Sequence, residues 1–120
     1  MIVLVVDDEK TWPDYYRTCV IDEPVQVFHA WRIDEAEQLL DEHRENIEVI
    51  IVDGYLGEPF QETLEFISRI RASGFTGPLI AASSSYKNNL AMRTRGCSHI
   101  AECKVIDRTE MRSIAPWLYM

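Results

Sequence analysis

A short apolar run in the middle of the chain constrains the fold more than any other feature. The run Val49–Val52 has no polar side chain, ends at Asp53, and is followed by a turn that contains Gly54 and Gly57. A run this short and apolar predicts a strand that is buried on both faces of a parallel sheet. Asp53 then lies at the carboxyl edge of the sheet, where open α/β sheets bind their ligands. A carboxylate there is suited to bind a metal ion or act as a nucleophile, although a lone aspartate is more often a turn residue.

The size and charge of the chain restrict the functions it can have. Its 120 residues are enough for one domain, spanning residues 1–120, and too few for two. The net charge of −8 argues against general nucleic-acid binding and against binding to an anionic membrane. The apolar start of the chain lacks a basic segment and a cleavage site, and no apolar run is long enough to span a membrane. We therefore expect a cytoplasmic protein.

The cysteines agree with that location. Cys19, Cys97 and Cys103 are scattered and form no C-x-x-C motif. A zinc site or a disulfide framework is therefore not expected, and a reducing compartment fits. Cys19 follows an apolar helical pattern, so we expect it in the core.

Apolar runs alternate with helical patterns along the whole chain. We expect strands at residues 2–6, 25–30, 49–52, 79–82 and 98–103, and helices at residues 11–20, 33–44, 60–73, 87–95 and 107–118. Strict alternation of strands and helices requires parallel crossover connections. The sequence therefore predicts an α/β fold, a doubly wound five-stranded parallel sheet with five alternating helices.

Several helix ends have recognisable signals. Thr11 and Asp107 are expected to be N-caps, each with an acidic residue three positions later. Gly96 is expected to end the fourth helix as its C-terminal cap. Pro116 lies inside the last helical pattern, and we expect it to kink or end that helix.

The predicted sheet brings polar residues from four strands to one edge. Asp7 and Asp8 follow the first strand, Asp53 follows the third, Ser83 follows the fourth, and Lys104 follows the fifth. Three carboxylates close together repel one another, and a hard divalent cation such as Mg²⁺ relieves that repulsion. A hydroxyl and an ammonium beside them are the groups that stabilise a transferring phosphoryl group.

These residues resemble the receiver domain of bacterial two-component response regulators, a flavodoxin-like or CheY-like fold. The acidic pair, the strand-end aspartate, the hydroxyl and the lysine all match. The spacings also match, with 45 residues from Asp8 to Asp53, 30 from Asp53 to Ser83, and 21 from Ser83 to Lys104. The resemblance covers the whole chain.

The resemblance implies a phosphoryl acceptor. Asp53 would take a phosphoryl group from phosphohistidine on a histidine kinase or a histidine phosphotransfer protein. Asp8 and Asp53 would bind Mg²⁺ directly, Asp7 would bind it through water, and the backbone carbonyl of Tyr55 would complete the protein ligands. Such a protein catalyses its own phosphorylation and dephosphorylation and is not a turnover enzyme on an external substrate.

The resemblance also implies a switch. Lys104 would pair with the phosphoryl group, and the Ser83 hydroxyl would bond a phosphoryl oxygen and draw its loop inward. The surface of the fourth helix, fifth strand and fifth helix would then change. Because the chain ends at Met120, just after the last helix, we expect a stand-alone receiver that signals through a downstream effector protein, without direct contact with nucleic acid or a membrane.

Two features depart from the family pattern near the fifth strand. The family has proline after its lysine, whereas Val105 follows Lys104 here. The preceding segment is also one residue longer, so that an alignment without a gap puts Cys103 at the lysine position. We favour Lys104, because Asp107 and Met111 then fall in step with the last helix.

The second departure concerns the aromatic residue that normally accompanies the switch hydroxyl. Its place on the fifth strand is taken by Ile100, or alternatively by His99 or Ala101. A degenerate receiver, acting as an interaction module without phosphotransfer, is therefore a second hypothesis. The third is a dehalogenase-like phosphatase, which needs Asp-x-Asp where this chain has Asp7-Asp8-Glu9. A dinucleotide-binding fold ranks lower, because no G-x-G-x-x-G follows a strand.

Other residues near these motifs have plainer interpretations. Trp12 follows the acidic loop, and we expect it to pack its helix rather than border the site. The basic residues of the fourth helix, Lys87, Arg93 and Arg95, are expected to be a solvated face, with a docking surface for an acidic partner as the alternative.

Overall fold

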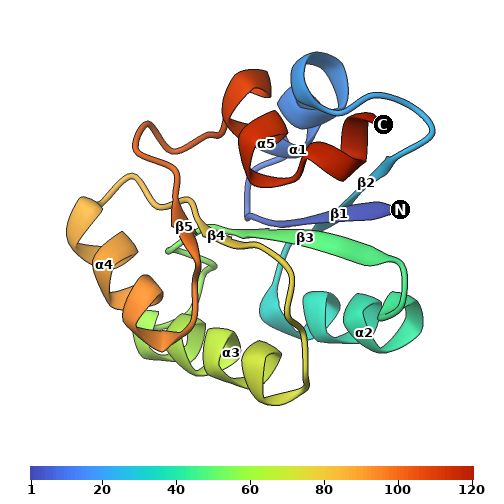
Figure 1. Cartoon of the computed structure of the whole chain (residues 1–120). Helices are drawn as coiled ribbons and strands as arrows, with labels where there is room; N and C mark the ends of the chain where they lie inside the picture. The colour runs from blue at the N-terminus through green and yellow to red at the C-terminus, as the bar shows by residue number, and fades with distance from the viewer.

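Five parallel strands form one sheet at the centre of the computed structural model, which describes residues 1–120 (Figure 1). The sheet order is β2-β1-β3-β4-β5, so the chain reverses its direction of winding after β2. The strands are β1 (Ile2–Val6), β2 (Gln26–Ala30), β3 (Ile47–Val52), β4 (Leu79–Ala81) and β5 (His99–Ile100). The predicted five-stranded doubly wound sheet is therefore confirmed.

Helices cover both faces of this sheet. They are α1 (Thr11–Tyr15), which continues as the π-helix η1 (Tyr16–Val20), α2 (Ile33–His43), α3 (Phe60–Ala72), α4 (Tyr86–Arg95), α5 (Arg108–Ile114) and the 3₁₀ helix η2 (Pro116–Tyr119). Figure 1 shows α1 and α5 on one face and α2 and α3 on the other, with α4 beside α3. No helix of the structure has the length and apolar character needed to cross a membrane.

The alternating side chains of the central strands build two separate cores. Leu4 and Ile50 are fully buried in the core under α2, α3 and α4. Val3 and Val49 are fully buried in the core under α1, η1 and α5. Burial on both faces explains why these strands appear in the sequence as uninterrupted apolar runs. Burial on both faces also determines where each strand ends. The first polar residue after the apolar run lies outside the two cores, at the edge of the sheet.

Three of the predicted helix ends agree with the structure, and one does not. Asp107 makes the reciprocal capping box with Glu110, and Gly96 has a φ of 141° that favours glycine at the end of α4. Pro116 ends α5 and begins η2. The expectation for Thr11 was wrong, because Lys10 occupies the N-cap position and no side chain caps the helix.

Two further expectations need correction. Cys19 is exposed and not part of the core, because Tyr16 and Val20 are the η1 residues that face the sheet. β5 spans only two residues and not the expected 98–103. The chain turns away after Ala101, whose carbonyl accepts a hydrogen bond from the Lys104 amide at 3.2 Å.

Candidate functional site

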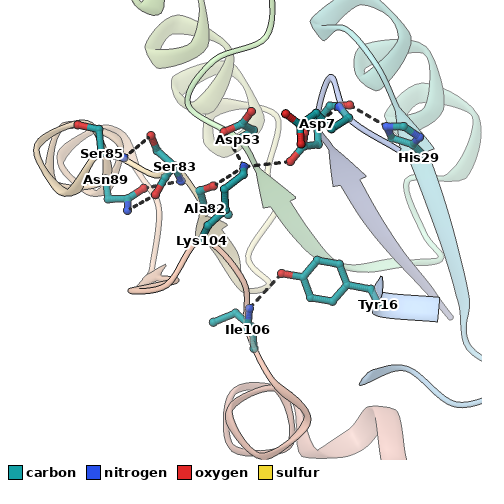
Figure 2. Close-up of polar contacts among 11 residues, drawn as sticks. Asp7, Tyr16, His29, Asp53, Ala82, Ser83, Ser85, Asn89, Lys104 and Ile106 are labelled. Atoms are coloured by element: carbon teal, nitrogen blue, oxygen red, sulfur yellow. Dashed lines mark hydrogen bonds and ion pairs between the residues drawn. The ribbon is translucent and has the colours of Figure 1, made fainter. Parts of the chain in front are cut away.

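The register of the central strands brings the predicted polar residues to one edge. Val6 is paired with Val52, and Val52 is paired with Ala81, so these three strands end at the same level. The Asp53 amide donates to the Val6 carbonyl at 2.8 Å, and the Ala82 amide donates to the Val52 carbonyl at 2.9 Å. Asp7, Asp53 and Ser83 therefore emerge side by side at the edge of the sheet (Figure 2).

The three aspartates form one acidic cluster. Each of Asp7, Asp8 and Asp53 offers a carboxylate oxygen, and these oxygens all lie within 4.8 Å of one another. Asp7 is 3% exposed and Asp53 is 8% exposed, whereas Asp8 is exposed to solvent. The cluster is therefore open on one side, where an ion or a ligand can approach.

Lys104 follows β5, the outer strand beside β4, and its side chain reaches this cluster. Its Nζ donates to Asp53 Oδ1 at 3.0 Å, to Asp7 Oδ2 at 3.2 Å and to the Ala82 carbonyl at 3.2 Å (Figure 2). Cys103, the alternative in the sequence alignment, is exposed to solvent. The structure thus brings Lys104, and not Cys103, against the two buried aspartates.

Burial dominates the electrostatics of these groups. It raises the pKa of Asp7 to about 6, because a charged carboxylate is poorly solvated there. Burial likewise raises the pKa of Asp53, although the charge of Lys104 acts in the opposite direction. Burial lowers the pKa of Lys104, but the charges of Asp53 and Asp7 outweigh this effect and leave its pKa above the usual value. The lysine is therefore a permanent cation beside carboxylates that ionise reluctantly.

The donor set fits Mg²⁺. Three carboxylates and one ammonium leave an excess of two negative charges when all three acids are ionised. Mg²⁺ prefers oxygen ligands and is commonly held by one or two carboxylates with several waters. Asp7, Asp8 and Asp53 are the side chains that would hold it, and the exposed side of the cluster leaves room for those waters.

Tyr55 lies in the turn directly after this cluster. Its side chain is 67% exposed. Its backbone amide lies near the Asp53 carboxylate and lowers the pKa of Asp53, against the larger rise that burial causes. The proposed metal-ligand role of its carbonyl stays a prediction, as do the chemical roles of the other site residues.

Ser83 is buried beside the cluster, and its loop is firmly held. Its Oγ accepts a hydrogen bond from the Ser85 amide at 3.1 Å. The side chain of Asn89 accepts from the Ser83 amide at 2.8 Å and donates to the Ser83 carbonyl at 3.0 Å. A Cβ added at Gly54 would lie 2.7 Å from the Ser83 side chain. The hydroxyl is therefore next to the Asp53 turn but is engaged by its own loop.

Several residues that support the site have no recognisable signal in the sequence. Asn89 holds the Ser83 backbone from α4, and a polar residue on a polar helix has no distinguishing signal. His29 Nε2 donates to the Asp7 carbonyl at 2.7 Å, although the sequence indicates no ligand-like neighbour for it. Trp12 was expected to pack its helix, but its ring also lies 5.6 Å from Lys104 Nζ.

The structure also places the three residues that were considered for the aromatic position at the fifth strand. Ile100 is half-buried against the core under α3 and α4. Ala101 is fully buried in the opposite core, and His99 bonds its neighbour Ser98 at 2.8 Å. None of these three positions carries a phenylalanine, tyrosine or tryptophan ring.

Comparison with known proteins gives no match by sequence and a consistent match by structure. No protein-family model and no curated protein matches the chain. The response regulator receiver protein of Pseudoalteromonas atlantica has a TM-score of 0.79 at 14% identity, covering 98% of both chains. The receiver domain of a Francisella response regulator has a TM-score of 0.73 at 21% identity, covering 98% of this chain and 95% of that one.

A further solved structure shows the same likeness. The N-terminal domain of an uncharacterized protein from Wolinella succinogenes has a TM-score of 0.76 at 22% identity, covering 99% of this chain and 94% of that chain. Likeness at these identities establishes the fold. The chain has the fold of response regulator receiver domains, the CheY-like variant of the flavodoxin-like architecture.

Proposed function

We propose that this protein is a response regulator receiver that accepts a phosphoryl group on Asp53 from a phosphohistidine donor. The observation that carries the proposal is the contact between Lys104 Nζ and Asp53 Oδ1 at 3.0 Å, within an acidic cluster at the sheet edge. If Lys104 were only a solvated lysine and Asp53 only a turn residue, nothing would require Lys104 to meet side chains and carbonyls from the ends of three strands. The fold is the one in which other proteins are named receivers.

The chemistry follows from the positions of these groups. An Asp53 oxygen attacks phosphorus, the new O–P bond forms, and the P–N bond to the donor histidine breaks. The electron pair returns to the imidazole nitrogen, which takes up a proton. During this transfer Lys104 pairs with the phosphoryl oxygens, where charge accumulates in the transition state. Mg²⁺ held by Asp7, Asp8 and Asp53 would offset the repulsion between the carboxylate and the incoming phosphoryl oxygens.

Ser83 gives this site a response to phosphorylation. Its Oγ accepts a hydrogen bond in the present structure, and its own O–H remains a donor for a phosphoryl oxygen. Drawing Ser83 toward Asp53 would pull on α4 through Asn89, and so alter the surface formed by α4, β5 and α5.

The proposal extends to partners and location. The donor would be a histidine kinase or a histidine phosphotransfer protein, and the output would pass to a downstream effector protein. One protein of similar fold is named a LuxR family DNA-binding response regulator from Silicibacter pomeroyi; for this acidic chain we propose no direct contact with nucleic acid. Three free cysteines agree with a reducing cytoplasm. The protein modifies itself and does not turn over an external substrate.

Intact mass spectrometry tests the proposal directly. The wild type is incubated with Mg²⁺ and acetyl phosphate beside Asp53→Asn, which preserves the size of the side chain. We expect one added phosphate in the wild type and none in the variant. A phosphate on another aspartate in Asp53→Asn would overturn the assignment. No uptake by folded, Mg²⁺-binding wild type would instead favour the degenerate receiver, an interaction module independent of phosphorylation.

A further inference from the structure

The backbone at Lys104 is in an unusual conformation. Lys104 has a φ of 69° and is the only residue other than glycine with a positive φ. A residue with a Cβ adopts this region at a cost, so it persists only where the surrounding structure holds it. The next residue, Val105, leaves the backbone free to rotate at φ, whereas a proline would fix it. Within the turn, the Lys104 amide bonds the Ala101 carbonyl at 3.2 Å, and contacts from outside the segment must supply the remaining restraint.

Polar contacts fix only the tip of the Lys104 side chain. The three acceptors of its Nζ lie at the ends of β1, β3 and β4. The flexible stem of a lysine has several rotatable bonds, so contacts at the tip alone are compatible with more than one path of the stem and backbone. The side of Lys104 that faces away from these acceptors requires its own support.

Two aromatic residues from the first helical segment supply that support. Trp12 in α1 and Tyr16 at the start of η1 lie one turn apart, because the Tyr16 amide bonds the Trp12 carbonyl. The Lys104 Nζ lies 5.6 Å from the centre of the Trp12 ring. The Tyr16 hydroxyl accepts a hydrogen bond from the Ile106 amide at 3.1 Å (Figure 2). The two contacts therefore lie on either side of Val105.

The burial of these aromatic residues makes the contacts rigid. Tyr16 is 1% exposed and belongs to the core under α1 and α5. Trp12 packs against the same core, and its indole nitrogen is buried without a hydrogen-bond partner. The indole therefore acts through its ring face and bulk, and an aromatic face attracts a cation held above it.

We propose that Trp12 and Tyr16 are positioning residues that hold the Lys104 ammonium group against the Asp53 carboxylate. This inference rests on the proposed phosphorylation of Asp53. Trp12 restrains the side chain through its ring, and Tyr16 restrains the backbone through the Ile106 amide. Neither residue touches the phosphoryl group. Their effect on the reaction is to keep the ammonium in place before the phosphoryl group arrives, which avoids reorganisation during transfer.

The kinetic test uses variants that remove each contact separately. Tyr16→Phe removes only the hydroxyl, Trp12→Leu removes the aromatic face, and Trp12→Phe retains such a face. Because small misplacements of a reacting group are costly, we expect Tyr16→Phe and Trp12→Leu to slow phosphate uptake from acetyl phosphate by about ten- to a hundredfold. Trp12→Phe should recover most of the lost rate.

Matched controls separate positioning from general packing. Tyr15→Phe removes a neighbouring phenol that makes no hydrogen bond, and Trp117→Leu removes an indole on η2 that lines a pocket with Ile47 at the start of β3. Both controls should take up phosphate at the wild-type rate. Equal slowing in the controls and in the test variants would overturn the proposal.

A second measurement reads the position of Lys104 without phosphorylation. The chain has three lysines, Lys10, Lys87 and Lys104, so a protein labelled with ¹³C at the lysine ε position gives three assignable NMR signals. We expect the Lys104 signal to be displaced by the Trp12 ring current, and to move toward those of the other two lysines in Trp12→Leu and Tyr16→Phe. An undisplaced Lys104 signal in the wild type would overturn the positioning role.

The two readouts distinguish this inference from the proposed function. A displaced Lys104 signal in a protein that takes up no phosphate would contradict the proposed function and leave the positioning of Lys104 intact. Wild-type rates of phosphate uptake in Trp12→Leu and Tyr16→Phe would contradict the positioning role and leave the proposed function intact.

Discussion

The buried carboxylate of Asp7 belongs to the candidate site and makes the fold less stable. Its carboxylate is almost completely buried, and its partners are the Glu9 amide at 2.9 Å and Lys104 at 3.2 Å. Lys104 is shared with Asp53, so neither aspartate has a cation of its own. Unfavourable burial of charge is therefore concentrated at the residues that would bind a metal ion.

Asp7 should make the stability of the fold depend on pH. Its pKa is raised from the ordinary value to about 6, so the folded state holds this proton more tightly than the unfolded chain. The stabilising contribution is thus complete at acidic pH and is lost as the pH rises through about 6. In EDTA, we expect Asp7→Asn to raise the free energy of unfolding at pH 8 by about 1–3 kcal/mol and to have little effect at pH 4.

Urea denaturation of both proteins at a series of pH values checks this expectation. The informative quantity is the difference between wild type and Asp7→Asn, because other carboxylates contribute to both curves. Asparagine keeps an acceptor for the Glu9 amide, and Lys104 keeps Asp53 and the Ala82 carbonyl. A difference that does not change with pH would show that Asp7 is ionised without penalty.

Gly54 is the second residue at which a small change should have a large effect. An added Cβ would lie 2.7 Å from both Cβ and Oγ of Ser83, a separation that real side chains do not adopt. We expect Gly54→Ala to displace Ser83, to lower the free energy of unfolding by about 1–3 kcal/mol and to slow phosphate uptake.

A double variant tests the cause of that effect. Ser83→Gly removes the two atoms that the new methyl group would meet. The double variant Gly54→Ala/Ser83→Gly should therefore be less destabilised than the sum of the two single variants, as measured by urea denaturation. Simple additivity would mean that Gly54 matters for a reason other than its contact with Ser83.

The lysine position shows why one residue-level question could not be decided from the sequence. The choice between Lys104 and Cys103 depends on a turn in which Lys104 itself has a positive φ, and no glycine or asparagine announces that conformation. Once the turn is formed, Lys104 points into the site and Cys103 points to solvent. Long-range contacts with β1, β3 and α1 select this turn.

At the scale of elements, the Asn89 side chain ties the connection between β4 and α4 to the helix. Asn89, which is 1% exposed, bonds both the amide and the carbonyl of Ser83. Removing that side chain leaves two buried backbone groups without partners. We expect Asn89→Ala to lower the free energy of unfolding by about 2–4 kcal/mol, since each such group costs about 1–3 kcal/mol.

Asn88→Ala is the matched control for that prediction. Asn88 is the preceding residue of α4 and is only half-buried, and its side chain makes no hydrogen bond, whereas its amide bonds Ser85 Oγ at 3.2 Å. We expect a change below about 0.5 kcal/mol in urea denaturation, as is usual for surface substitutions. Equal losses in both variants would show that α4 tolerates neither substitution for reasons of helix packing.

The elements themselves were predictable wherever a local signal decides the structure. Apolar runs gave β1 and β3, the capping box gave the start of α5, and Pro116 gave its end. The failures lie where tertiary contacts override local preference. The switch from α-helix to π-helix at Tyr16 has no sequence signal, and it decides which side chains of η1 face the sheet and leave Cys19 exposed.

For the molecule as a whole, parallel topology explains why the candidate site was predictable before its supports. A parallel sheet must collect the ends of its strands at one edge, so Asp7, Asp53 and Ser83 had to approach one another. No such rule applies to residues on helices. Asn89 and Trp12 reach the site through helix orientation and packing, which depend on the whole core and not on any local pattern.

The last prediction concerns the binding of Mg²⁺ to the whole folded molecule. Only the folded chain brings the three carboxylates within 4.8 Å, so an ion that binds there stabilises folding, and the gain grows with the logarithm of its concentration once that exceeds the dissociation constant. Protons compete for Asp7 below about pH 6, and the stabilisation should therefore be larger at pH 7.5 than at pH 5.

Thermal unfolding in Mg²⁺, compared with KCl of equal ionic strength, separates binding from screening. Asp8→Ala, at an exposed position, should fold normally and lose the Mg²⁺ effect. Equal stabilisation by KCl, or an unchanged Mg²⁺ effect in Asp8→Ala, would mean that the cluster is not the metal site.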